Sequence, residues 1–451
     1  MKSYSTFNAK NNNETKCNLS ADIELSNSTD SSTSIQKIGH KGFGTLTAAV
    51  FITGEMGGSG ILALPKAIVD SGGWIGVVLL VVFCLNACYG GICLGYCWNI
   101  LEERYTEYRT TTRNPYSSIA FRAVGRWGSR LVSGCIQFTL FGAGTVYLLL
   151  SSQILQKLLK DLFPNQSFCF WFLIIALILT PAMWLGSPKD FWAVAITATV
   201  TTILACICMF SQSVLDGNHK SGRVPHRIHD FHEFFLAFGT LLFAFGGAST
   251  FPTIQNDMKD KKKFSTSLCI AFSVIMALYL PVTIGGYTVY GEHVNANVIL
   301  SLSKSSLSVF AEILMGIHLV SAFLIIINPV SQEIEEILDV PHDFHWKRCL
   351  LRSAIVFLMV LIGETIPDFG KIVSLVGGST ITLLTFVLPP YFYMRLCSQK
   401  SFEWPERHIP FYIRMYLWEL ILVGLVGGTA STYSAILAIF GSHMTKPCFW
   451  V

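Results

Sequence analysis

The chain has 451 residues, of which 52% are hydrophobic and 13% are charged, and its mean hydropathy is +0.52. A soluble domain carries about 25% charged residues, so this composition excludes an ordinary soluble fold and favours one polytopic membrane domain. The net charge of +4 says little as a total, and no nucleic-acid partner is expected.

Residues 1–40 are polar, rich in Asn, Ser and Thr, and have no apolar period. A segment of that composition cannot bury enough apolar surface to fold, so we expect a disordered tail, which the orientation derived below puts in the cytosol. The tail also lacks the apolar stretch of a cleavable signal peptide. Residues 41–451 are expected to form a single transmembrane domain.

Apolar segments recur about eleven times after the tail, each able to cross a bilayer as a helix. Their approximate bounds are 44–69, 74–100, 130–159, 168–184, 191–215, 234–258, 264–290, 307–331, 350–366, 369–396 and 413–439. The predicted fold class is therefore an all-α polytopic membrane protein. An odd number of spans places the two termini on opposite sides of the membrane.

Basic residues orient these segments. With the N-terminus in the cytosol, roughly 23 of the 32 basic residues fall on the cytosolic side, as the positive-inside rule requires. The main exception is the loop between the fifth and sixth segments, which puts Lys220, Arg223 and Arg227 outside. Residues 115–125 are mildly amphipathic and are expected to form a short helix on the cytosolic surface.

Glycine-rich breaks interrupt the first and the sixth segments, at residues 57–60 and 246–249. Each break lies roughly 12–14 residues into its segment, about 20 Å deep at the rise of an α-helix. Unwound backbone at that depth is tolerated only where it lines a cavity, and two broken helices in corresponding positions indicate a transporter binding site. The alternative is that the glycines serve close packing between helices.

The chemistry of the two breaks is complementary. The helix that restarts near Ser59 presents unpaired N–H groups and the positive end of its dipole, which suit a carboxylate. The sixth segment frees carbonyl groups near Phe245 and Gly246, which suit an ammonium group, and Ser249 or Thr250 is expected to cap the helix that follows. The predicted binding residues are Gly57, Gly58, Ser59, Gly60, Ile61, Phe245, Gly246, Gly247 and Ser249.

Glu55 is the candidate for coupling to an ion, because it lies one turn before the first break at about mid-membrane. A charged carboxylate is costly there, so Glu55 could bind and release a proton. The alternatives are a site for a cationic substrate or a structural hydrogen bond to a neighbouring span. His318 is interpreted as a core histidine with satisfied hydrogen bonds rather than a proton relay.

Other chemistry is not indicated. The cysteines at 84, 88, 93 and 97 have no His or carboxylate partner, so we expect no metal site, and cysteine in a membrane helix acts as a small apolar residue. Cys169 and Cys448 lie near the outer side and allow at most one disulfide there. The chain has no nucleotide-binding loop, nucleophile elbow or zincin motif, so we expect neither an enzyme nor an ATP-driven pump, and no cofactor.

Several stretches resemble the amino acid/auxin permease family. They are Gly58–Pro65 in the first segment, Ala244–Asp260 in the sixth, Tyr279–Gly291 in the seventh, Asn328-Pro329 with Glu335-Glu336 in the eighth, and Ile366–Pro390 in the tenth. The resemblance covers about residues 40–440 and looks nearest to the vesicular inhibitory amino acid and proton-coupled branches. It implies the five-plus-five inverted repeat of LeuT-type carriers, with helices 1 and 6 broken, and transport of amino acids.

These observations favour a secondary active transporter of amino acids, working by alternating access as a symporter or exchanger. A proton is favoured over sodium as the coupling ion, although a sodium-coupled symporter stays open. A second class is an amino-acid sensor or receptor on the same fold. The expected partners are thus a small amino acid, the coupling ion and the bilayer. The expected location is the plasma membrane or a lysosomal or vesicular membrane.

Overall fold

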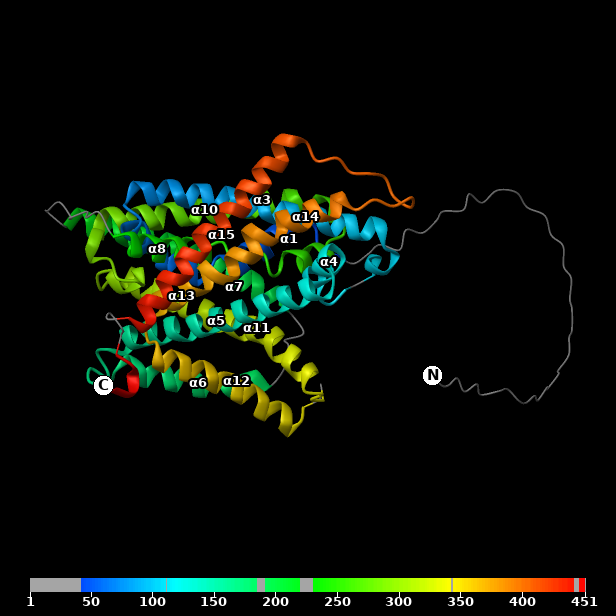
Figure 1. Cartoon of the computed structure of the whole chain (residues 1–451). Coiled ribbons are helices and arrows are strands. Elements are labelled where there is room, and N and C mark those ends of the chain that lie inside the picture. Colours follow the sequence, from blue (N-terminus) through cyan, green and yellow to red (C-terminus); the bar gives the residue numbers. More distant parts are fainter. Residues whose placement is uncertain are drawn as a thin grey trace, which may run out of the picture. The chain divides into compact units, whose positions relative to one another are not determined.

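The computed structural model describes residues 42–110, 112–184, 191–219, 230–341, 344–441 and 446–450. Within these ranges the chain forms helices joined by turns and loops, with one isolated β-bridge between Phe43 and Met258 (Figure 1). The expected disordered tail of residues 1–40 lies outside the described residues.

Each predicted apolar segment has a helical counterpart. In the first half these are α1 (Thr45–Met56) with α2 (Ser59–Asp70), α3 (Trp74–Arg104), α5 (Arg126–Leu159), α6 (Phe168–Trp184) and α7 (Phe191–His219). In the second half they are α8 (Phe231–Phe243) with α9 (Phe251–Asn256), α10 (Phe264–Tyr290), α11 (Ser306–Ile337), α12 (Trp346–Thr365), α13 (Phe369–Val376) continuing into α14 (Leu388–Ser398), and α15 (Phe411–Phe440).

Length and apolar composition alone identify seven helices in the described ranges that could each cross a membrane, or eight when α1 and α2 count as one bent span. Helices α6 and α8 are apolar but shorter. Several helices begin before their predicted start, and α5 begins at Arg126 and α12 at Trp346. Hydropathy misses these first turns because they carry charged residues.

The bend between α1 and α2 is 60° and falls at Gly57 and Gly58. Gly58 adopts φ −129° and ψ −123°, which lies outside the helical region and so separates the two helices. The tenth span bends differently, because residues 377–381 and 383–387 form π-helical turns before Pro389 and Pro390. Extra residues per turn, followed by prolines without an N–H, loosen this helix without interrupting it.

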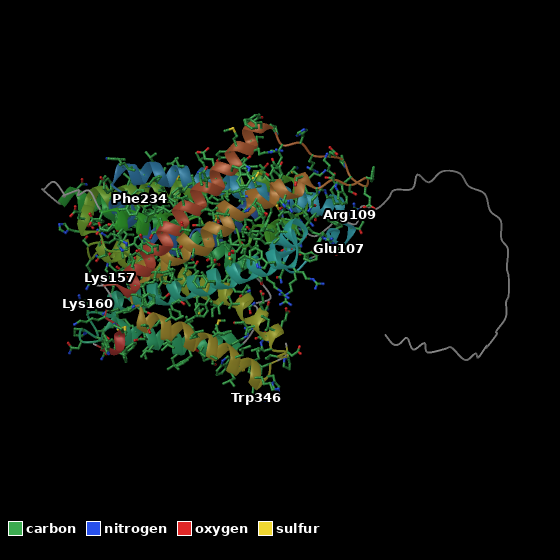
Figure 2. All side chains as sticks on the ribbon, viewed as in Figure 1. Glu107, Arg109, Lys157, Lys160, Phe234 and Trp346 are labelled. Carbon is green, nitrogen blue, oxygen red and sulfur yellow. A yellow bond between two sulfur atoms is a disulfide. The ribbon has the colours of Figure 1, made fainter. Side chains whose placement is uncertain are left out.

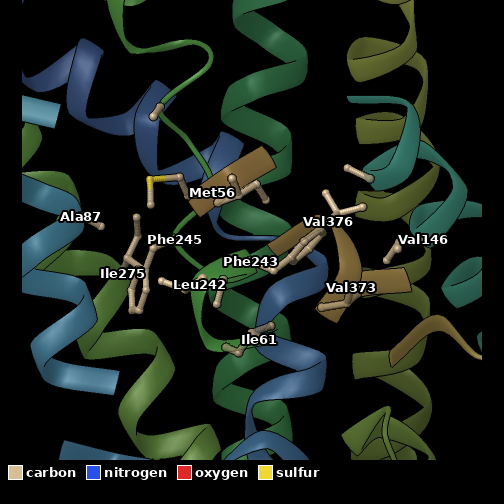
Figure 3. Packing of buried hydrophobic residues seen from close by; sticks show 14 of the residues in the cluster. Met56, Ile61, Ala87, Val146, Leu242, Phe243, Phe245, Ile275, Val373 and Val376 are labelled. Atoms are coloured by element: carbon tan, nitrogen blue, oxygen red, sulfur yellow. The ribbon is translucent and has the colours of Figure 1, made fainter. Parts of the chain in front are cut away.

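Apolar side chains pack around both breaks. Met56 and Phe245 lie with Leu242 and Ile275 on one side, and Val376 lies beyond Phe243 on the other (Figure 3). Helices α6 and α12 pack against each other and against α5 at one edge of the bundle (Figure 1). The core is therefore built by the same spans that enclose the two breaks.

The short helix expected at residues 115–125 is α4 (Pro115–Val124). It does more than lie on the surface, because Tyr116 is buried and donates a hydrogen bond of 2.6 Å to the carbonyl of Leu384. The one disulfide that the sequence allowed is present: Cys169, at the start of α6, is bonded to Cys448 near the C-terminal end.

Loops that the charge pattern assigns to opposite sides do lie at opposite ends of the bundle. Glu107 and Arg109 lie at one end, whereas Lys157 and Lys160 lie at the other (Figure 2). The loop of Glu107 was assigned to the cytosol and the end of α5 to the outside. We therefore call the end with Glu107 the inner end and the end with Lys157 the outer end.

Candidate functional site

The two breaks lie together around one cavity of about 40 Å³. Three further spans, α5, α11 and the π-helical part of the tenth span, complete its wall. The lining residues are Glu55, Met56, Ser59, Gly60, Thr139, Leu140, Ala143, Tyr147, Phe243, Gly246, Ser249, Ile326 and Ile381. Polar groups from the breaks thus face a wall from the other spans that is apolar except for the hydroxyls of Thr139 and Tyr147.

At the first break, neighbouring spans bind the freed carbonyls. Thr202 of α7 donates a hydrogen bond of 2.8 Å to the Gly57 carbonyl, and Tyr279 of α10 donates one of 2.8 Å to the Met56 carbonyl. Helix α2 then begins at Ser59, and no side chain caps its N-terminus. Its first N–H groups are therefore left for a ligand or water, as expected for a carboxylate site.

The second break is longer and folds back on itself. Helix α8 ends at Phe243, and the backbone closes turns from Gly246 N to Phe243 O (3.0 Å) and from Gly247 N to Phe245 O (3.0 Å). The carbonyl of Phe245, which we expected to face an ammonium group, is therefore bonded within the break. Thr250 is the N-cap of α9, but its hydroxyl donates to the carbonyl of Gly247 at 3.0 Å and caps no helical N–H.

Glu55 joins the two breaks. Its carboxyl group, at the end of α1, forms a hydrogen bond with the hydroxyl of Thr250, which precedes α9. The side chain remains exposed to the space around it, although it lies deep inside the helical bundle. Glu55 is therefore positioned by its hydrogen bond with Thr250, and its side chain is also accessible to water.

That path is a vestibule of about 340 Å³ between α4, α5, α9 and α11. Glu55, Leu140 and Ser249 line both the vestibule and the smaller cavity, so the two are contiguous. The remaining wall is polar: Glu333 accepts hydrogen bonds from Ser133 and Gln137, and Arg113 pairs with Glu336. All these side chains belong to the inner end of the molecule.

The structure places the predicted residues in two groups. Five of them, Glu55, Ser59, Gly60, Gly246 and Ser249, line the cavity. The others, Gly57, Gly58, Ile61, Phe245 and Gly247, are not among its lining residues. Phe245 is buried, and its ring stacks on that of Phe272 at 6.2 Å.

Close packing accounts for several of the glycines. A Cβ on Gly58 would lie 2.8 Å from Nε2 of His318, and one on Gly247 would lie 2.8 Å from the sulfur of Met56. A Cβ on Gly60 would lie 2.8 Å from the Cα of Ala244, where the two breaks touch backbone to backbone. Glycine is therefore required at these positions for contact between helices, in addition to any contact with a ligand.

Sequence reasoning missed the wall that faces the breaks. Thr139, Ala143 and Tyr147 of α5, with Ile326 of α11 and Ile381 of the tenth span, line the cavity. Nothing in their local sequence distinguishes them from other residues of apolar helices. The hydroxyl of Tyr147 hydrogen-bonds Ser59, and a polar group in the middle of a span was the one signal available.

Two other carboxylates of α11, and His318 on the same helix, have surroundings separate from the cavity. Glu312 of α11 pairs with Lys157 of α5 at 2.8 Å, and buried Glu335 pairs with buried Arg352 at 2.6 Å. His318 was interpreted as satisfied, but only one of its ring nitrogens is. Nδ1 lies 3.0 Å from the hydroxyl of Thr202, whereas Nε2 has no partner among the side chains that the structure describes.

The family described as transmembrane amino acid transporter protein matches residues 41–437. The chain belongs to this family. Among its relatives, the amino acid transporter AVT1C of Arabidopsis thaliana is 26% identical over 399 residues, which cover 85% of this chain and 67% of AVT1C. The amino acid transporter AVT1J of Arabidopsis thaliana is 25% identical over 402 residues, which cover 86% of this chain and 89% of AVT1J.

Solved structures confirm the fold. The manganese transporter of Eremococcus coleocola matches with a TM-score of 0.56 and 11% identity, covering 91% of this chain and 93% of that one. The transporter MhsT, solved in complex with L-phenylalanine, matches with a TM-score of 0.53 and 11% identity, covering 86% and 98%. This chain is thus a multi-pass integral membrane protein with the LeuT-type five-plus-five fold, and it is a transporter rather than an enzyme.

Proposed function

We propose that the chain is a secondary active transporter that moves amino acids by alternating access, coupled to a proton in symport or exchange. The observation that carries this proposal is Glu55. It joins the two helix breaks through Thr250 and lines both the central cavity and the vestibule at the inner end. A carboxyl group at that place can exchange a proton with the inner solution and influence a ligand at the breaks.

The amino acid would occupy the central cavity. Its carboxylate would bind the uncapped N–H groups at the start of α2, near Ser59 and Gly60. Its ammonium group would lie on the side of Gly246 and Ser249. Its side chain would face the apolar wall formed by residues such as Ile326.

The carbonyl groups freed at the helix breaks already accept hydrogen bonds, and this favours a proton over sodium as the coupling ion. A sodium ion needs several oxygen ligands, and the freed carbonyls of a broken helix are its natural source in this fold. Here Tyr279 donates to the carbonyls of Met56 and Ala244, and Thr202 donates to that of Gly57. Sodium would have to displace these hydroxyls, whereas Glu55 needs no rearrangement to bind a proton.

The proposed orientation puts the N-terminus in the cytosol and the C-terminus outside or in a lumen. The vestibule then faces the cytosol, and the structure represents an inward-facing state. The membrane would be the plasma membrane or that of a lysosome or vesicle. In sealed vesicles that expose the cytosolic face of the membrane, a C-terminal tag should be protected from added protease. Cleavage of that tag would contradict the orientation.

The decisive experiment compares Glu55→Gln with the wild type in proteoliposomes. Glutamine mimics the protonated carboxyl permanently, so uptake driven by a pH gradient should fall by at least about tenfold. Counterflow of labelled amino acid without a gradient needs no net proton release and should persist. Glu336→Gln is the matched control, because it removes a carboxylate from the same vestibule at the ion pair with Arg113, and it should behave like the wild type.

The other outcomes are equally informative. Wild-type pH dependence in Glu55→Gln, or uptake that follows a sodium gradient, would reject proton coupling through Glu55. Binding of amino acid by the wild type without any flux would favour the sensor. Screening the common amino acids in the same vesicles would identify the substrate.

A further inference from the structure

His318 is buried at the first break, and only one of its two ring nitrogens makes hydrogen bonds with described residues. It lies on α11, its exposed fraction is 1%, and its Nδ1 contacts the Thr202 hydroxyl at 3.0 Å and the Ala198 carbonyl at 3.2 Å. On the opposite edge of the ring, Nε2 is buried and makes no hydrogen bond with any described residue. Buried polar atoms without a partner are rare and need a reason.

The contacts of Nδ1 fix the tautomer. The Thr202 hydroxyl donates its proton to the Gly57 carbonyl at 2.8 Å, so towards His318 it can only accept. The Ala198 carbonyl can also only accept. Nδ1 must therefore carry the ring proton, and Nε2 is left as a bare lone pair.

This lone pair lies beside Gly58 in the first break. Nε2 lies 2.8 Å, and the Tyr147 hydroxyl 3.4 Å, from the point where a Cβ on Gly58 would be. The Tyr147 hydroxyl also bonds Ser59 and interacts electrostatically with Glu55, and all three of these residues line the cavity. A hydroxyl can both accept and donate, so Tyr147 could link the cavity to Nε2, with which it makes no hydrogen bond in this state.

Among the residues that the structure describes, few titratable groups surround the imidazole. Tyr147 faces it from α5, and Glu55 lies across the break on α1. Helix α7 presents Thr202 and Ala198, which do not titrate in this range. On α11 itself, Glu312 is six residues away and is paired with Lys157.

The two candidate groups differ in access. Because α11 runs from the outer end to the inner end, His318 lies nearer the outer end than Ile326, which lines the cavity with Glu55. Glu55 is open to the inner vestibule, whereas His318 lines none of the cavities described here. We propose that His318 is a second proton-accepting residue of the transport cycle, which binds a proton at Nε2 on the outer side of the break and exchanges it with Glu55 through Tyr147.

In the proposed step, a proton on Nε2 passes to the Tyr147 oxygen as the hydroxyl proton of Tyr147 passes to the Glu55 carboxylate. Tyrosine begins and ends neutral, His318 loses one positive charge and Glu55 loses one negative charge. This inference rests on the proposed proton coupling, which Glu55→Gln tests separately.

Two substitutions of His318 test the roles of its two ring nitrogens separately. Asparagine places an amide N–H where Nδ1 is, so His318→Asn keeps the donor to Thr202 and Ala198 and removes the base. Glutamine places an amide oxygen where Nε2 is, so His318→Gln keeps an acceptor that cannot bind a proton. His293→Asn is the control, because this histidine is exposed and lies before α11 in the outer loop.

The variants are compared in proteoliposomes by gradient-driven uptake at several outer pH values and by counterflow. His318→Asn should keep counterflow and lose at least about tenfold of gradient-driven uptake, with a flattened dependence on outer pH. His318→Gln should lose that uptake as well, and His293→Asn should match the wild type. Wild-type uptake and pH dependence in His318→Asn, or full uptake in His318→Gln, would overturn the proposal.

Tyr147→Phe decides the case in which His318→Asn also loses counterflow. It keeps the ring in place and removes the relay hydroxyl, so gradient-driven uptake should fall and its dependence on outer pH should flatten. A wild-type pH profile in Tyr147→Phe would then overturn the proposal. If His318→Asn is silent while Glu55→Gln separates uptake from counterflow, the role of His318 fails and the proposed function stands.

Discussion

The two helix breaks solve the same physical problem in different ways. In the first, residues Gly57 and Gly58 alone separate two helices, and the freed carbonyls are bonded by Thr202 and Tyr279 from other spans. In the second, residues 244–250 separate α8 from α9, and most of the freed groups close turns within the break. A short break thus depends on tertiary contacts, whereas a long one is largely satisfied locally.

This difference follows from the cost of unpaired backbone groups in a membrane. Each such group costs several kcal/mol in hydrocarbon, so a break must find partners in its own chain or in its neighbours. A movement of a span that hydrogen-bonds the first break would therefore also change the conformation of that break. Three of its contacts, with Thr202, Tyr279 and His318, come from α7, α10 and α11.

The largest effect is expected where the breaks touch each other. In Gly60→Val the new Cβ would lie 2.8 Å from the Cα of Ala244, and backbone on both sides cannot move away. Overpacking of this kind costs about 1–3 kcal/mol and often more for a β-branched residue, so the unfolding midpoint of the purified protein should fall sharply.

Two further variants serve as a milder case and as a control for this prediction. Gly247→Val meets side chains and not backbone, namely flexible Met56 and the buried ring of Phe251, and should cost less than Gly60→Val. Gly134→Val is the control, because nothing lies within 4 Å of its Cβ position. Equal loss of stability in Gly60→Val and Gly134→Val would show that helix propensity, and not contact between the breaks, limits stability.

A smaller effect is expected for Tyr279→Phe. The hydroxyl of Tyr279 donates to the carbonyl of Met56 at 2.8 Å and lies 3.2 Å from that of Ala244, so it serves both breaks. Its removal leaves buried carbonyls without this donor and should cost about 1–3 kcal/mol, measured as a lower unfolding midpoint in detergent. An unchanged midpoint would mean that the breaks do not share this bond in solution.

Thr202→Val should cost less than Tyr279→Phe, because only the Gly57 carbonyl loses its partner and Nδ1 of His318 keeps the Ala198 carbonyl. The expected loss is about 1–2 kcal/mol, together with weaker counterflow. Thr201→Val is the control on the same helix, since that hydroxyl donates to α7's own backbone at Thr197, 2.9 Å away. The comparison between the breaks would be wrong if both threonine variants lost the same stability.

The smallest effect is expected far from both breaks, at Glu107 in the inner loop. Hydrogen bonds from Arg122, and then from Tyr108, hold the pKa of Glu107 below its ordinary value. A lowered folded-state pKa adds stability above the unfolded-state pKa of about 4.3, and that stability is lost as the pH falls through the folded-state pKa. The midpoint of Glu107→Gln should thus be slightly lower than that of the wild type at pH 7, and the two should converge in acid.

Several features of the fold could be predicted from composition and spacing. Apolar runs with few charges gave the spans, and Gly57-Gly58 and Gly246-Gly247 marked the two breaks because consecutive glycines disfavour a helix. The orientation left Cys169 and Cys448 on one side and so allowed at most one disulfide there, which the structure contains. The helix starts at Arg126 and Trp346 were misplaced because hydropathy does not register charged first turns.

The candidate site was predicted only in part. Glu55, Ser59 and Gly246 do line one cavity, because broken helices at equal depth must meet when the spans pack. The sequence could not indicate that Phe245 faces away from the cavity, since the turns of the second break decide its direction. It could not indicate the opposite wall either, because Tyr147 and Ile326 are distant in sequence from both breaks.

By itself, then, the sequence determined what local chemistry controls: which segments are apolar, which end carries the positive charge, where helices must break, and which family motifs are present. Tertiary structure alone decided which partners satisfy the broken backbone. The pairing of Thr202 with Gly57, the bond of Thr250 to Glu55 and the bare nitrogen of His318 each join spans far apart in the chain. Their cause is the direction in which each helix presents a side chain once all the spans are packed.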